Sequence, residues 1–259
     1  MTSEAARASS TAKASAVPGR RPLLLAHRGA RLYAPENTIA AFEFALAHGC
    51  DGFECDVRLT VDGEAVICHD PKLYALEVSR SNYRELVERS LRNQGGDGGI
   101  LEMAHALVLP KLETVLKTFA TSAFLNIELK VRGLENIAMD VLNQYPPKRG
   151  CVVSSFLPET LEWLHELGAR FDLGLICETK GQFSVWSKLP VKAVMLHHRL
   201  VDEDRLRELR EAGKQIFVWT VNTEEGMRYL AGLGVDGIIS DDTVLLTRTL
   251  GGDPLAAEG

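Results

Sequence analysis

Two histidines, three carboxylates and two fixed cations stand at or near the ends of short apolar runs in this chain. In α/β proteins the residues that perform chemistry gather at the carboxyl ends of strands, because these ends meet at one edge of the sheet. Histidine titrates near neutral pH and can both accept and donate a proton, so the pattern predicts an active site. The set comprises His27, Arg28, Glu54, Asp56, His69, Glu128 and Lys130.

The spacing of the charged residues predicts which of them share a face. Residues two apart in a strand point to the same side, so Glu54 and Asp56 face together while Cys55 points the other way. Glu128 and Lys130 face together by the same rule. One such pair of charged residues could equally well form solvated ion pairs at a strand end. Two such pairs, together with a first strand that carries a histidine, favour an active site.

The charges of this set predict a metal ion. Three carboxylates and two cations leave one negative charge, an anionic substrate adds a second, and one divalent cation balances both. Oxygen ligands from Glu54, Asp56 and Glu128 suit Mg²⁺ or Ca²⁺ better than zinc, and ligand type does not choose between these two.

The histidines are then left for proton transfer. His27 and His69 are expected to act as general acid and base, each contributing a factor of about 10² to 10⁴ in rate. Asp70 either orients the ring of His69 or belongs to a turn before Pro71. Trp219 either forms an apolar wall for the substrate's alcohol part or packs in the core.

Alternating apolar runs and segments of helical period predict a (β/α)8 TIM barrel spanning residues 21–250 as a single domain. Length agrees, since 259 residues suit one barrel. No G-x-G-x-x-G turn follows the first run, which argues against an open dinucleotide-binding sheet. Asn37 or Thr38 is expected to cap the first helix. Eight strands are predicted, at Leu23–His27, Gly52–Val57, Phe124–Leu129, Cys151–Ser155, Leu173–Cys177, Ala193–Leu196, Ile216–Val221 and Gly237–Ser240.

An insertion of about residues 58–110 follows the second predicted strand. Asp62-Gly63 predicts a hairpin turn that returns Ala65–Cys68 as a strand and brings His69 to the mouth of the barrel. A helix is expected near Tyr83–Ser90. The glycine-rich run 95–99 is either part of a cover over the active site or a plain surface loop.

Composition excludes several classes of partner. A net charge of -6 gives no general attraction to nucleic acid or to an anionic membrane surface. No apolar run approaches the roughly 20 residues of a membrane span.

Residues 1–20 are expected to be a disordered tail, with a targeting arm as the alternative, and residues 251–259 a loose tail. Five cysteines without C-x-x-C spacing predict reduced thiols and a cytoplasmic protein. The oligomeric state is not predicted.

In order and spacing, these motifs resemble the glycerophosphodiester phosphodiesterase family, in particular its cytosolic bacterial members. The resemblance runs from about Leu24 to Asp241, and the combination is far more specific than any single motif. The matching segments are His27-Arg28-Gly29, Pro35-Glu36-Asn37-Thr38, Glu54-Cys55-Asp56-Val57, Asp62-Gly63, His69-Asp70, Asn126-Ile127-Glu128-Leu129-Lys130, Ser154-Ser155-Phe156, Trp219-Thr220-Val221-Asn222 and Asp236-Gly237-Ile238-Ile239-Ser240-Asp241.

The resemblance implies a metal-dependent barrel enzyme that splits glycerophosphodiesters into glycerol 3-phosphate and an alcohol. By position, it implies that Glu54, Asp56 and Glu128 bind the metal, that His27 and His69 exchange protons, that Arg28 and Lys130 hold the phosphate, and that Trp219 lines the glycerol or alcohol side. The nucleophile is expected to be either water or the glycerol 2-hydroxyl, and the sequence does not choose between them.

The chain departs from the family pattern inside the insertion. Family members often continue after the second histidine motif with Arg-Thr and glycines, whereas this chain continues with Pro71-Lys72-Leu73. Pro110-Lys111-Leu112 likewise replaces the usual Pro-Thr-Leu. The preferred alcohol therefore stays open. A lysophospholipase D acting on lysophospholipids is the alternative activity, and a non-catalytic binding barrel is the third reading.

Overall fold

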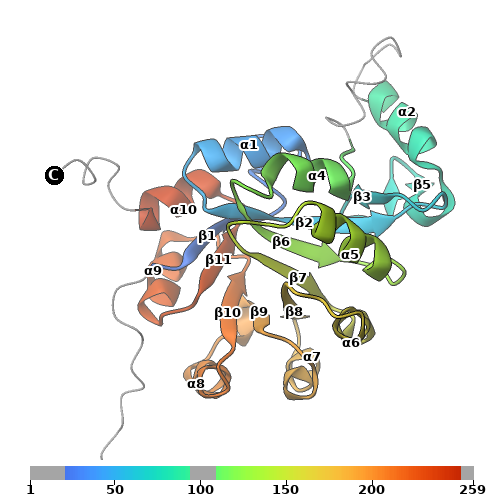
Figure 1. The fold of residues 1–259 in the computed structure, drawn as a ribbon. Coiled ribbons are helices and arrows are strands. Elements are labelled where there is room, and N and C mark those ends of the chain that lie inside the picture. The colour runs from blue at the N-terminus through green and yellow to red at the C-terminus, as the bar shows by residue number, and fades with distance from the viewer. Residues whose placement is uncertain (1–20, 94–108, 252–259) are drawn as a thin grey trace, which may run out of the picture.

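The protein folds into a closed parallel barrel surrounded by helices, and Figure 1 shows this arrangement. The computed structural model describes residues 21–93 and 109–251. Within these residues each barrel strand pairs in parallel with the next, and β1 closes the ring by pairing with both β11 and β2. The predicted (β/α)8 barrel is confirmed. Its strands are β1 (Leu23–Ala26), β2 (Gly52–Leu59), β6 (Phe124–Leu129), β7 (Cys151–Ser155), β8 (Asp172–Cys177), β9 (Ala193–His197), β10 (Gln215–Trp219) and β11 (Gly237–Ser240).

Helices connect the strands and cover the outside of the barrel (Figure 1). Several begin with the side-chain cap that their sequences suggest, including α1, where Thr38 accepts a hydrogen bond from the backbone N–H of Ala41. Thr38, and not Asn37, is therefore the cap. The helices are α1 (Ile39–Ala47), α4 (Leu112–Phe119), α5 (Glu135–Gln144), α6 (Pro158–Glu166), α7 (Lys180–Phe183), α8 (Glu203–Glu211), α9 (Glu224–Gly232) and α10 (Thr243–Leu250).

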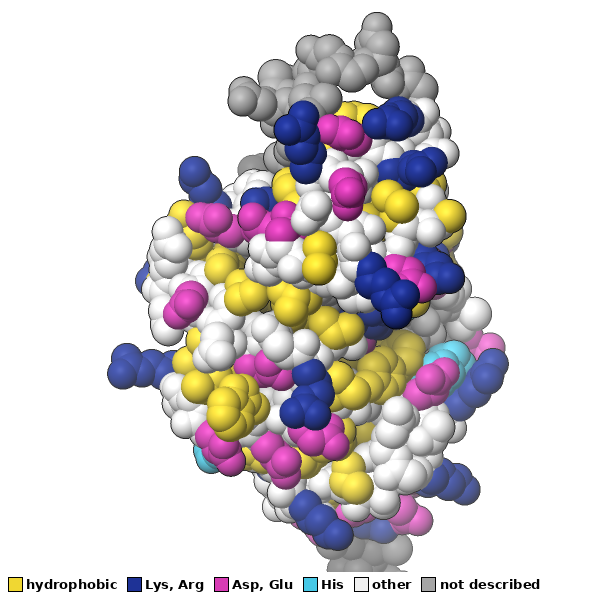
Figure 2. Space-filling view, turned by 90° about the vertical axis from the view of Figure 1, so that its right-hand side faces the viewer, with side chains coloured by type: hydrophobic (Ala, Val, Ile, Leu, Met, Phe, Trp, Pro, Cys, Tyr) yellow, Lys and Arg dark blue, Asp and Glu magenta, His cyan; other side chains and the backbone are white. Residues whose placement is uncertain are grey.

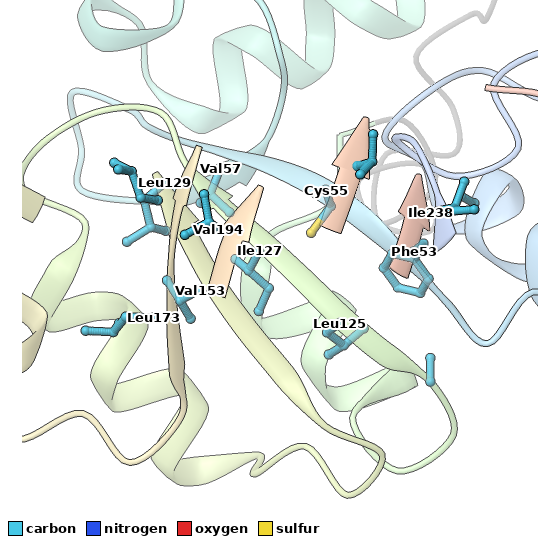
Figure 3. Close-up of a cluster of buried hydrophobic side chains, with 14 of the residues drawn as sticks. Phe53, Cys55, Val57, Leu125, Ile127, Leu129, Val153, Leu173, Val194 and Ile238 are labelled. Carbon is cyan, nitrogen blue, oxygen red and sulfur yellow. The ribbon is translucent and has the colours of Figure 1, made fainter. Parts of the chain in front are cut away.

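The strands divide their side chains between two environments. Phe53, Cys55 and Val57 of β2 point outward and are completely buried against the helices. Figure 3 shows them beside the equivalent residues of β6. Each large apolar side chain buried in this layer stabilises the fold by about 1.5–3 kcal/mol. The alternate residues of β2, Glu54 and Asp56, consequently point into the barrel.

A second, smaller apolar cluster fills the barrel interior. Five strands contribute one inward-facing residue each, and β9 contributes two, Ala193 and Met195. In each strand the next inward position after the last of these residues lies at the carboxyl end. Chemistry-bearing side chains occupy those end positions. The interior cluster contains Leu25, Val152, Ile176, Ala193, Met195, Phe217 and Ile239.

The insertion after β2 has its own small core. β3 (Ala65–Ile67) pairs antiparallel with β2, and Gly63 adopts a φ of +83° in the predicted Asp62-Gly63 turn. The helix expected near Tyr83 is α2 (Tyr83–Asn93). The glycine-rich run 95–99 and most of the predicted terminal tails, residues 1–20 and 252–259, lie outside the described residues.

Two short elements of the insertion were not predicted. β4 (Lys72–Leu73) and β5 (Leu76–Glu77) form a two-residue hairpin in which Tyr74 and Ala75 have φ values of 47° and 70°. Such turns normally carry Asn or Gly at these positions. The residue types therefore offered no turn signal. A 3-10 helix, η1 (Val78–Arg80), follows, and two more lie later, η3 (Trp186–Lys188) and η4 (His198–Leu200).

The surface is mixed in charge. In Figure 2 basic and acidic side chains alternate over the visible face of the described residues, with no broad area of one sign. In the described part of the chain, no helix has the length and apolar character needed to cross a bilayer.

Gly29 allows α1 to lie close to the end of β1. Its φ of +77° is left-handed, and a Cβ added there would stand 2.7 Å from the Cβ of Ala41. Gly213, at the end of α8, has a similar φ of +67° but open space around it. Of these two glycines, Gly29 therefore meets both a conformational and a steric constraint, and Gly213 meets the conformational one alone.

Replacing each of these glycines by alanine should separate the two constraints. Gly213→Ala should cost about 1 kcal/mol through its left-handed backbone. Gly29→Ala should cost about 1–3 kcal/mol more, because the methyl group collides with Ala41. Urea unfolding of the two variants measures the decrease in the free energy of unfolding. Equal decreases would show that the contact between Gly29 and α1 does not limit stability.

Candidate active site

A cavity of about 250 Å³ opens at the carboxyl ends of the barrel strands. Seven of the eight residues predicted for the site line it. The eighth, Asp56, is buried against two of them, Arg28 and Lys130. The structure thus brings all eight together. The cavity wall consists of His27, Arg28, Glu54, His69, Asn126, Glu128, Lys130, Phe156, Ile176, Glu178, Met195, Trp219 and Ile239.

Three carboxylates form the centre of the site. One oxygen from each of Glu54, Asp56 and Glu128 lies within 4.8 Å of the others, and all three residues are buried. They converge because β2 and β6 are neighbours, with Asp56 directly opposite Glu128 in the register. This is the cluster that the alternation of residues along two strands predicted.

Two cations contact this cluster, and both reach Asp56. Lys130 Nζ lies 3.2 Å from Asp56 Oδ1 and 2.7 Å from Glu128 Oε1. Arg28 Nε lies 3.3 Å from Asp56 Oδ2, and its Nη1 donates to Glu36 Oε1 at 3.1 Å. The backbone N–H of Arg28 also donates to Glu54 Oε2 at 3.0 Å. Arg28 holds a φ of 56°, a left-handed conformation, while it makes these contacts.

The three carboxylates differ in how easily they ionise. Burial opposes the charge of Asp56, but the attraction of Lys130 and Arg28 wins and lowers its pKa. Burial, together with the negative charges of Asp56 and Glu128, raises the pKa of Glu54 well above its usual value. Burial and Asp56 likewise raise the pKa of Glu128 to about 7. The nearby cations therefore do not fully compensate the negative charge of the two glutamates, although Lys130 contacts Glu128.

The cluster has room for a further positive partner. Glu54 Oε1 is buried and accepts no hydrogen bond from any described residue. A buried carboxylate oxygen without a partner is costly, and a metal ion or a proton relieves it. These oxygen ligands fit a hard divalent cation.

His27 is held by a residue that the sequence reasoning left without a role. Its Nδ1 lies 2.7 Å from Asp241 Oδ1, and its Nε2 lies 4.0 Å from Glu54 Oε2. Burial opposes ionisation of Asp241, but hydrogen bonds from His27 and Asn222 lower its pKa to about 2. The ionised carboxylate can only accept, so Nδ1 donates to it and Nε2 is left facing the cavity.

His69 shows the same arrangement nearer to solvent. Its Nδ1 lies 2.8 Å from Asp70 Oδ1, which supports the orienting role considered for Asp70. The backbone carbonyl of His69 accepts a hydrogen bond from Arg58 Nε at 2.7 Å. Burial lowers the pKa of His69, although the charge of Asp56 opposes this. His69 comes from the insertion, so the hairpin delivers the second histidine to the barrel mouth as predicted.

Trp219 both packs and lines the cavity. Its Nε1–H donates to the carbonyl of Met195 at 3.0 Å. Its ring packs edge-to-face with Phe156 and with His197, at centroid distances of 5.9 and 5.1 Å. Since the polar N–H is already satisfied, only the apolar surface of the indole is free to face the cavity.

Two other positioning residues were missed. Asn37 Nδ2 donates to Asp56 Oδ2 at 2.9 Å, and Asn37 Oδ1 accepts from the backbone N–H of Asp56. Asn222 Nδ2 donates to Asp241 Oδ2 at 2.6 Å. Spacing alone could have found Asp241, because it lies two residues after the inward-facing Ile239. Asn37 belongs to a motif shared with the family, but its contact with Asp56 depends on the path of the loop before α1.

The low pKa of Asp241 predicts how stability changes in acid. An unfolded aspartate titrates near 3.9, so its contribution is complete above that pH and is lost as the pH falls through about 2. Asp241→Asn should therefore lower stability at neutral pH by up to about 2 kcal/mol and flatten its fall between pH 4 and pH 2.

Urea unfolding at several pH values measures this effect. Asp70→Asn is the matched control beside the other histidine, because the side chain of Asp70 is 71% exposed. It should change stability by less than about 0.5 kcal/mol. The interpretation fails if Asp241→Asn keeps the pH dependence of the parent protein.

Comparisons with known proteins agree with the fold and with the family that the motifs resemble. The model of the glycerophosphoryl diester phosphodiesterase family matches residues 27–245. The glycerophosphodiester phosphodiesterase of Bacillus altitudinis is 31% identical over 231 residues, covering 84% of this chain and 94% of the relative. The corresponding enzyme of Caldanaerobacter subterraneus subsp. tengcongensis is 30% identical over 233 residues, covering 86% and 95%.

Solved structures share the barrel. An Oleispira antarctica phosphodiesterase, solved in complex with the product sn-glycerol-3-phosphate, has a TM-score of 0.76 at 24% identity and covers 88% of this chain and 96% of its own. A glycerophosphodiester phosphodiesterase from Thermotoga maritima has a TM-score of 0.72 at 24% identity, covering 89% and 99%. The chain belongs to the glycerophosphoryl diester phosphodiesterase family, as its motifs predicted.

Proposed function

We propose that this protein hydrolyses glycerophosphodiesters to glycerol 3-phosphate and an alcohol, and that it requires one divalent cation, Mg²⁺ or Ca²⁺. The observation that carries the proposal is the convergence of three buried carboxylates, two cations and two histidines on one cavity. Membership of the phosphodiesterase family supports the reaction class.

Glu54, Asp56 and Glu128 are the proposed ligands of the cation. The unpartnered Glu54 Oε1 and the raised pKa values of Glu54 and Glu128 support this assignment, because both indicate missing positive charge. When bound, a divalent cation neutralises charge that develops on the phosphate oxygens.

Arg28 and Lys130 are the proposed phosphate-binding residues. Both line the cavity, and both are anchored on their inner side by Asp56. A guanidinium and an ammonium each have more donors than these contacts use, so they can bind phosphate oxygens without losing Asp56.

The two histidines are the proposed proton carriers. Each has its Nδ1 next to an aspartate, so each presents Nε2 for exchange. One Nε2 accepts the proton of the attacking hydroxyl as the new P–O bond forms. The other donates a proton to the alcohol oxygen as the old P–O bond breaks. The attacking hydroxyl belongs to water or to the glycerol 2-hydroxyl, in which case a cyclic phosphate forms and water then opens it.

Cavity size favours a compact substrate. A volume of about 250 Å³ lies just below the usual range for small-molecule sites, about 300–1,000 Å³. A glycerophosphodiester has no acyl chain to accommodate. The alternative, a lysophospholipase D, is distinguished by including lysophosphatidylcholine in the substrate panel. We also propose a cytoplasmic location, on the ground that the five cysteines suit reduced thiols.

Removing either histidine should abolish most of the activity. His27→Ala and His69→Ala should each lower kcat by about 10²- to 10⁴-fold, because each removes one proton-transfer group. Release of glycerol 3-phosphate from glycerophosphocholine, with Mg²⁺ or Ca²⁺ present, is the measurement. His165→Ala, an exposed position on α6, should keep the activity of the parent protein. A histidine variant with near-normal kcat would remove that residue from the mechanism.

Neutralising single carboxylates should affect the metal-free protein in opposite directions. Glu54→Gln should raise its Tm, because the charge at Glu54 is disfavoured by burial and by its neighbours. Asp56→Asn should lower it, because Asp56 forms ion pairs with both Arg28 and Lys130.

The same variants test metal binding without an activity assay. At a cation concentration 100 times its Kd, the parent protein should gain about 2.7 kcal/mol of stability. Both variants should lose most of that gain, and Glu225→Gln, on the exposed face of α9, should retain it. Full retention of the gain in Glu54→Gln would exclude Glu54 as a ligand.

A further inference from the structure

The wall of the cavity is divided into two halves of different chemistry. The half formed by the ends of β1, β2 and β6 carries the proposed metal ligands and the phosphate-binding cations. The half formed by the ends of β7 to β10 is mostly apolar and contributes Phe156, Ile176, Met195 and Trp219. One carboxylate, that of Glu178, also lies on this second half.

Glu178 occupies a defined place in the barrel. It lies two residues after Ile176, an inward-facing residue of β8, so the alternation of the strand directs it to the cavity. Counting around the closed ring, the end of β8 is four strands from the end of β1. Glu178 therefore lies across the mouth from Arg28. Its backbone N–H donates to Gln182 Oε1 at 2.9 Å, which ties it to the start of α7.

No described residue forms an ion pair with the Glu178 carboxylate. Arg28 and Lys130 are already paired with carboxylates on their own half. His197, the nearest polar neighbour on β9, accepts a hydrogen bond at Nδ1 from the backbone N–H of Arg199, so this nitrogen carries no proton. The negative charge of Glu178 is therefore not compensated by the cations that pair with the proposed metal ligands.

The surroundings of Glu178 are suited to an organic cation. Phe156 stands at the boundary of the two halves, since its ring lies 5.8 Å from Lys130 Nζ and 5.9 Å from the ring of Trp219. An alcohol held beyond the phosphate would meet the apolar rings first and the carboxylate at the rim. Aromatic rings and a carboxylate together attract ammonium groups.

We propose that Glu178 selects glycerophosphodiesters whose alcohol carries an ammonium group, such as choline or ethanolamine. This inference rests on the proposed function and names its substrate class. The charges of the proposed metal, the three carboxylates, the two cations and the phosphate sum to zero. The ammonium group of the alcohol then neutralises the negative charge of Glu178 on the cavity wall. A neutral alcohol leaves that charge unpaired.

The test compares two substrates that differ in the charge of the alcohol. The ratio of kcat/KM for glycerophosphocholine to that for glycerophosphoglycerol should be above one in the parent protein. Glu178→Gln should lower this ratio by about 3- to 10-fold, the effect of one partly exposed charge pair. Glu178→Lys should lower it further, because it turns attraction into repulsion. High salt should bring the parent ratio towards that of Glu178→Gln.

Glu225→Gln, on the outside of the barrel, makes the same chemical change without reaching the cavity and should leave the ratio unchanged. If the parent protein hydrolyses both diesters and the Glu178 variants keep its ratio within twofold, the inference is overturned while the proposed function stands. If the parent protein hydrolyses neither diester, the proposed function fails, and the inference fails with it.

Discussion

The site depends on the carboxylate of Asp56, which joins three separate parts of the chain. It pairs with Arg28 after β1 and with Lys130 after β6, and it accepts a hydrogen bond from Asn37 in the loop before α1. A carboxylate only 1% exposed is tolerated because these partners compensate for the lost hydration. The two cations that would bind phosphate are thereby held in place before a substrate arrives, which reduces the cost of binding.

The same strands provide both stability and chemistry. Outward-facing residues such as Cys55 and Leu129 are fully buried between barrel and helices. Their inward neighbours behave differently, since Glu128 lines the cavity and Asp56 lies buried behind Arg28 and Lys130. Stability gained in the outer layer permits a cluster of like charges inside, where the pKa of Glu54 is raised by its neighbours. The proposed metal ion would supply the positive charge that this cluster requires.

Residues positioned by strand alternation were predictable, and so was His69, because the Asp62-Gly63 turn before it has a clear sequence signal. Residues placed by loops without such a signal were not predictable. Glu54 and Asp56, or Glu128 and Lys130, follow from the period of two along a strand. The hairpin at Tyr74 and Ala75 lacks the usual turn residues, so only its backbone angles reveal it. Asn37 was read as a candidate helix cap, yet Thr38 caps α1 and Asn37 turns towards Asp56.

By itself, the sequence determined the barrel, its eight strands, the acidic cluster and the two histidines, because apolar periodicity and residue type are local properties. Only the tertiary structure decided which side chains meet across the ring. Asp241 contacts His27 because β11 closes on β1, and Glu178 faces the same cavity as Arg28 because β8 lies four strands away. Contacts of this kind depend on how the barrel closes, and strand periodicity carries no information about that closure.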